Sequence, residues 1–179
     1  MEKQNVLWKR FFALSAGKTN EAHHSFIKRL KGIGQMEVTS PEKSDYLLIF
    51  CPVNSQVGAD IAEALDTIPR GKPVILVVMH HTSNPEQVVA ESWRQVKNEN
   101  VHLTVDCLVY EGKLLDCNFN DIMWRDIGKF FRVSIHQLIQ TSKWQKWSCC
   151  SDPLILGIGF IMCVMMVATV AMEVVRRMI

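Results

Sequence analysis

Small polar residues, carboxylates and histidines follow two apolar runs of the sequence, DYLLIFCPV and KPVILVVM. The candidate binding residues are Asn54, Ser55, Gly58 and Thr82, and the candidate catalytic residues are Asp60, Glu63, His80 and His81. A carboxylate can act as a nucleophile, a neutral imidazole can transfer protons near pH 7, and a backbone amide at a helix start can hold an anionic or sugar group. The spacing contains no set of nucleophile, base and orienting residue, so it predicts a ligand-binding edge without naming a reaction.

The two apolar runs predict the strands that position these residues. Residues 46–51 and 74–79 are unbroken apolar stretches, which are typical of strands buried on both faces of a parallel sheet. Between them, Ile61, Leu65 and Ile68 recur at helical spacing. Strand, helix and strand in this length predict a βαβ unit with a right-handed crossover.

The rest of the chain extends this pattern up to residue 140. We predict further strands at 6–14, 36–39 and 101–108, helices at 21–33, 85–97 and 118–140, and a small hairpin at 110–114. The fold class is therefore α/β, with a mostly parallel, doubly wound sheet between two helical layers, of flavodoxin-like or Rossmann-like type.

In such sheets, ligands bind beyond the carboxyl ends of the strands. We expect four segments to converge there, at 15–18, 52–58, 80–82 and 106–107. This edge would place Asp106 near the histidines. The same residues could also be no more than the polar ends of loops, an alternative that the spacing leaves open.

Charge and cysteine usage exclude some classes of function. The formal net charge of +2 is small and the basic residues are spread along the chain, so nothing indicates nucleic-acid binding. The six cysteines include no C-x-x-C pair, which argues against a structural zinc site or a redox motif. We expect reduced thiols that serve as small core side chains, no metal site and no evident cofactor.

An apolar stretch, LILGIGFIMCVMMVATVAM, occupies residues 154–172. As a helix it would be about 28 Å long, close to the hydrocarbon thickness of a bilayer. We expect a cytosolic domain at 1–140, a juxtamembrane linker at 141–152, a transmembrane helix at 153–175 and a short basic end at 176–179. This layout resembles tail-anchored proteins of the mitochondrial outer membrane or endoplasmic reticulum. Cys149 and Cys150, next to the span, are candidates for S-palmitoylation.

The motifs CPV, GADI and KPVILVVMHHT also carry a resemblance. They resemble a group of uncharacterised proteins that share a CPV…G-x-D-I…KPVILVV-x-HHT signature. More remotely, the chain is similar to nucleoside 2-deoxyribosyltransferases and to TIR-like and nucleotide-sensing Rossmannoid domains. In the transferases, the nucleophilic glutamate stands four residues after the loop glycine. Counted from Gly58, that place holds Ala62, and Glu63 is the next residue.

Because the glutamate is displaced, we expect a non-catalytic module rather than an enzyme. The expected function is signalling or scaffolding by a TIR-like or nucleotide-sensing domain on a membrane. Its partners would be the bilayer and other proteins or further copies of the chain, and a nucleotide is the candidate ligand. The alternative is an enzyme that cleaves or transfers the N-glycosidic bond of a nucleotide or nucleoside.

Overall fold

The computed structural model describes residues 8–66, 68–69 and 71–133, which form a six-stranded sheet with three α-helices. The strands are β1 (Arg10–Ser15), β2 (Met36–Glu37), β3 (Tyr46–Pro52), β4 (Val74–His81), β5 (Val101–Tyr110) and β6 (Lys113–Leu114). The helices are α1 (Ala22–Gly32), α2 (Val57–Asp66) and α3 (Asn118–Phe131), and 3-10 turns occur at Pro41–Lys43 and Ser92–Gln95.

The predicted βαβ unit is present at the centre of the sheet. β3 and β4 pair in parallel, from Leu47 opposite Val74 to Pro52 opposite Met79, and α2 connects them. The strand order is β2-β1-β3-β4-β5-β6, and in this sheet β6 alone runs antiparallel to its neighbour. The first five strands therefore have the order of the flavodoxin-like doubly wound fold.

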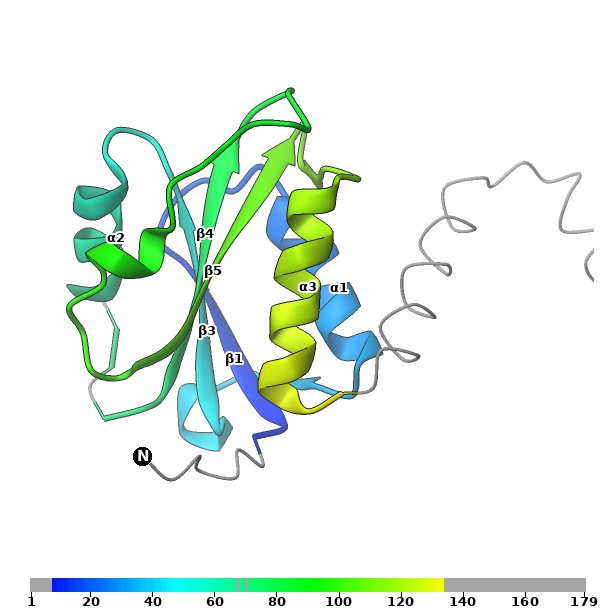
Figure 1. Ribbon diagram of the computed structural model, residues 1–179. Coiled ribbons are helices and arrows are strands. Elements are labelled where there is room, and N and C mark those ends of the chain that lie inside the picture. The colour runs from blue at the N-terminus through cyan, green and yellow to red at the C-terminus, as the bar shows by residue number, and fades with distance from the viewer. Residues whose placement is uncertain (1–7, 67, 70, 134–179) are drawn as a thin grey trace, which may run out of the picture. The chain divides into compact units, whose positions relative to one another are not determined.

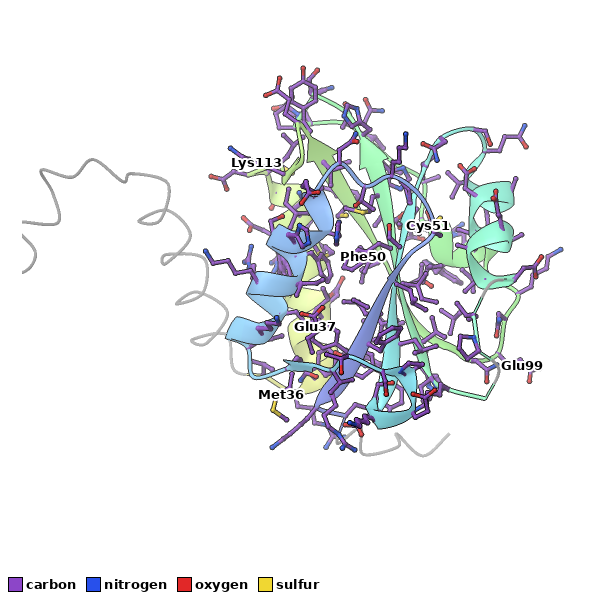
Figure 2. All side chains as sticks on the ribbon, turned by 180° about the vertical axis from the view of Figure 1, so that it is seen from behind. Met36, Glu37, Phe50, Cys51, Glu99 and Lys113 are labelled. Atoms are coloured by element: carbon purple, nitrogen blue, oxygen red, sulfur yellow. The ribbon has the colours of Figure 1, made fainter. Side chains whose placement is uncertain are left out.

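Alternation along the buried strands divides the core between two faces. Phe50 belongs to the cluster beneath α1 and α3, whereas Cys51 belongs to the cluster beneath α2. Figure 1 shows α1 and α3 on one side of the sheet and α2 on the other, and Figure 2 shows Phe50 and Cys51 on opposite sides of β3. The prediction of an α/β fold with a mostly parallel sheet and helices on both faces is confirmed.

Two of the described cysteines are core side chains, as expected from the sequence. Cys51 and Cys107 are buried and unpaired. Burial, together with the nearby Asp60 and Glu63 carboxylates, raises the pKa of Cys51 to about 12. This thiol therefore stays protonated and unreactive near neutral pH.

One carboxylate ties the starts of β1 and β3 together. Asp45 accepts hydrogen bonds from the backbone N–H groups of Lys9 and Arg10, and its second oxygen accepts from the Arg10 guanidinium at 2.8 Å. The Arg10 hydrogen bond lowers the pKa of Asp45 to about 2. This carboxylate therefore holds the amino ends of the two strands in register.

Two predicted helices are wrong in whole or in part. Residues 85–97 do not form an α-helix: they run as an irregular segment with one 3-10 turn at Ser92–Gln95. The expected apolar face included Val88 and Trp93, which are 87% and 57% exposed. The final helix ends at Phe131 rather than at residue 140, because Arg132 adopts a left-handed conformation with φ 55°.

The predicted tail lies outside the described residues. This applies to the linker at 141–152, the transmembrane helix at 153–175, the basic end at 176–179, and both Cys149 and Cys150. Within the described ranges, no helix combines the length and the apolar character needed to cross a bilayer.

Candidate functional site

The carboxyl ends of β1 and β3 flank the point where the strand order reverses, which is where doubly wound folds bind their ligands. Here the loops after these two strands pack against each other. A Cβ added to Gly17, in the first loop, would lie 3.1 Å from Pro52 Cγ and 3.9 Å from Asn54 Nδ2 in the second. The glycine thus permits a close approach of the two loops at this point.

Asp60 is committed to holding the loop that precedes α2. Its Oδ2 accepts hydrogen bonds from the backbone N–H groups of Asn54 and Ser55 at 2.9 and 3.1 Å, and its Oδ1 accepts from the Ser55 hydroxyl at 3.1 Å. These bonds, led by that from the Ser55 amide, lower the pKa of Asp60. The structure therefore brings together three of the predicted site residues, Asn54, Ser55 and Asp60. Their hydrogen bonds hold the loop before α2 in place, and we call this arrangement the loop clamp.

Gly58 and Glu63 lie on α2 and are not part of this clamp. A Cβ on Gly58 would come within 2.5 Å of Gln95 Oε1, the end of a flexible side chain from the 3-10 turn that lies against the helix here. Glu63 is exposed on the helix surface, and no described hydrogen bond or ion pair links it to either histidine. The predicted combination of a carboxylate nucleophile with a histidine is thus absent from the described contacts.

A second polar cluster lies between β5 and the crossing segment, by which we mean the irregular stretch that connects β4 to β5. Asp106 Oδ1 accepts a hydrogen bond from His80 Nε2 at 2.8 Å and one from Ser92 Oγ at 2.5 Å. The backbone N–H of Ser92 donates to Asp106 Oδ2 at 3.1 Å. Ser92 is completely buried, and the side chains of His80 and Asp106 are only 11% and 12% exposed.

The order of these three groups decides what they can do. In a hydrolase triad the imidazole lies between the serine and the carboxylate, so that it can take the serine proton. Here the carboxylate lies in the middle, and the Ser92 hydroxyl donates to Asp106 instead of to His80. Ser92 is therefore not activated as a nucleophile, and the cluster fixes the crossing segment to β5.

His81 and Thr82 lie beyond this cluster and make different contacts. The ring of His81 packs against Tyr110, with 5.6 Å between ring centroids. Thr82 Oγ1 accepts a hydrogen bond from the Asn84 backbone N–H at 3.1 Å and so begins a turn. Neither residue shares a described contact with Asn54, Ser55 or Gly58, so the predicted single binding edge is divided into separate local clusters.

Sequence reasoning did not find Ser92. It stands within the stretch that is predicted to be a helix, and its partner Asp106 follows fourteen residues later in β5. A polar residue inside the largely apolar run VHLTVDCLVY was the available signal that Asp106 needs a buried partner.

No metal-binding arrangement occurs among these residues: the described part of the chain contains no group of three or more His, Cys, Asp or Glu that could hold an ion. Comparisons with protein-family models, curated proteins and solved structures find no significant match to this chain.

Proposed function

We propose that this chain is a non-catalytic protein-interaction module, of the TIR-like or nucleotide-sensing type in architecture, which serves signalling or scaffolding at a membrane. The observation that supports a non-catalytic role best is the arrangement around Asp106, since the Ser92 hydroxyl donates to this carboxylate instead of to His80. The engagement of Asp60 in the loop clamp points the same way.

The sequence supports the membrane part of this proposal. Residues 154–172 are apolar or small apart from one threonine, and Arg176 and Arg177 follow them. We propose that this stretch anchors the chain in the mitochondrial outer membrane or the endoplasmic reticulum, with the α/β domain in the cytosol and Cys149 and Cys150 available for acylation. Restriction to a surface raises the effective concentration of the domain for partners on that surface.

Deletion of residues 153–179 tests the anchor. We expect the truncated protein to move from the membrane pellet, after extraction at high pH, to the supernatant, because it loses the apolar stretch that a bilayer can bury. As a control, replacement of 154–172 by an unrelated leucine–alanine stretch of equal length should restore pelleting. A truncated protein that stays in the pellet would place the membrane attachment elsewhere in the chain.

One observation favours the alternative, an enzyme acting on an N-glycosidic bond. His80 is oriented by Asp106 through Nε2, which leaves Nδ1 of the neutral ring as the nitrogen that can accept a proton. Under this alternative Glu63 or Asp60 would attack the sugar, and His80 or His81 would assist.

Incubation of the full chain with nucleotides and nucleosides separates the two functions. We expect no release of a free base, measured by chromatography, whether or not a nucleotide binds. Glu99→Ala is the control, because Glu99 is also an exposed glutamate. Base release that is lost in Glu63→Ala and retained in this control would show that the chain is an enzyme rather than a non-catalytic module.

A further inference from the structure

The outer edge of β1 is only partly covered by its neighbour β2. The two strands are in register at Arg10 and Phe11 alone, and the last backbone hydrogen bond between the two segments runs from Val38 N–H to Phe11 C=O. β1 continues to Ser15, whereas the chain after Val38 turns away into the 3-10 turn that begins at Pro41. Among the described residues, the second half of this strand therefore has no neighbour on that side.

The backbone groups that this edge presents follow from the ladder. The carbonyls of Lys9 and Phe11 accept from the β2 side, whereas Arg10 and Ala16 bond toward β3. Because successive residues of a strand alternate in direction, Ala13 and Ser15 present their N–H and C=O groups to the open side. In the part of the chain that the structure describes, no backbone group pairs with them there.

A hollow of about 570 Å³ lies against this open edge. β1 contributes Ala13 and Ser15, while Ile27 and the long side chains of Lys28 and Lys31 reach it from α1. Figure 2 shows α1 beside β1, with Phe50 in the sheet on the same side and Glu37 at the end of β2. An extended chain placed along Ala13–Ser15 would thus have backbone partners on one side and a pocket for a side chain beneath α1.

The charges around the hollow indicate which kind of peptide could bind along this edge. Lys28 is exposed and makes no ion pair with any described residue, whereas Lys31 is paired with Glu37 at 2.6 Å. His24 is likewise paired with Glu21, and the rings of His23 and His24 lie 4.0 Å apart. Among the described residues that line the hollow, the lysine without an ion pair is therefore Lys28. It favours carboxylates, and it disfavours a second copy, which would bring the same basic helix against itself.

We propose that the open edge of β1 binds an acidic, extended peptide of a partner protein, which adds a strand to the sheet next to β1 and places a carboxylate against Lys28. This mode of recognition takes affinity from main-chain hydrogen bonds and specificity from alternate side chains. The proposal rests on the proposed function in naming a protein as the partner, and it is independent of the membrane anchor.

The test uses the full chain in detergent micelles and two fluorescent peptides, Glu-Glu-Val-Ile-Val-Glu-Glu and its counterpart with lysine in place of glutamate. We expect fluorescence anisotropy to show saturable binding of the acidic peptide alone. We also expect slower amide hydrogen exchange at Ala13 and Ser15 when it is bound. Ala13→Pro removes an outward N–H that no neighbouring strand uses, so the strand tolerates it while binding weakens about tenfold or more.

Charge reversal gives a second variant that leaves the backbone unchanged. Lys28→Glu should abolish binding of the acidic peptide, whereas Lys97→Glu, an exposed lysine against the α2 side of the sheet, should leave it unaltered. Equal binding of both peptides, or no binding up to about 1 mM, would overturn the proposal. Binding of the acidic peptide that is unchanged in both Ala13→Pro and Lys28→Glu would also overturn it. Dimerisation that Ala13→Pro abolishes would also overturn it, in favour of a second copy.

These outcomes are separate from a failure of the proposed function. If the chain releases a free base from nucleotides, the proposal of a non-catalytic module is wrong, whether or not the peptides bind. If the chain releases no base and binds neither peptide, only the proposal that the β1 edge binds an acidic peptide is wrong.

Discussion

Replacement of Ile75 by aspartate is expected to unfold the α/β domain. Ile75 is 2% exposed in β4, which lies between β3 and β5 and is covered on both faces by the core. A carboxylate at this position would have to be buried without a partner, at a cost of several kcal/mol. Because whole domains are stable by only about 5–15 kcal/mol, we expect loss of the cooperative unfolding transition in near-ultraviolet circular dichroism.

Val88→Asp is the matched control for this variant. It introduces the same charge in place of a β-branched side chain, at a site that is 87% exposed. The free energy of unfolding should change there by no more than about 0.5 kcal/mol. A melting temperature of Ile75→Asp equal to that of the unmodified chain would mean that β4 is not a central strand.

The sequence predicts the centre of this fold well because burial on both faces leaves a simple pattern. The uninterrupted apolar runs at 46–51 and 74–79 correspond to β3 and β4, which pair in parallel as predicted. The face that each residue takes also follows from alternation, as Phe50 and Cys51 illustrate. Local period and hydrophobicity suffice for these features.

The sequence does not predict the irregular segment between β4 and β5, because its conformation depends on contacts with distant residues. Ser92 is held by Asp106 through two hydrogen bonds, and no periodicity connects the two positions. The approach of Gly17 to Pro52 is likewise a contact between two loops, which spacing alone cannot show. The spacing therefore predicts which loops follow the carboxyl ends of the strands, but not the separate contacts that the residues of those loops make.

Asp106→Ala is the second variant with a large expected effect, because three hydrogen bonds depend on this carboxylate. Its loss would leave the backbone N–H and the hydroxyl of the completely buried Ser92 without acceptors, and His80 Nε2 without its partner. Each unsatisfied buried group costs about 1–3 kcal/mol, so we expect a decrease of about 3 kcal/mol or more in the free energy of unfolding.

The location of the damage distinguishes a clamp from a catalytic carboxylate. Since Asp106 attaches the segment that crosses from β4 to β5, Asp106→Ala should accelerate tryptic cleavage at Arg94 and Lys97 and amide hydrogen exchange at Ser92, while α1 stays protected. Asp126→Ala is the control, because its ion pair with Lys129 lies on exposed side chains and contributes at most about 1 kcal/mol. Unchanged stability and unchanged cleavage in Asp106→Ala would show that the crossing segment is held by its apolar contacts alone. The buried carboxylate would then require a role other than structural support.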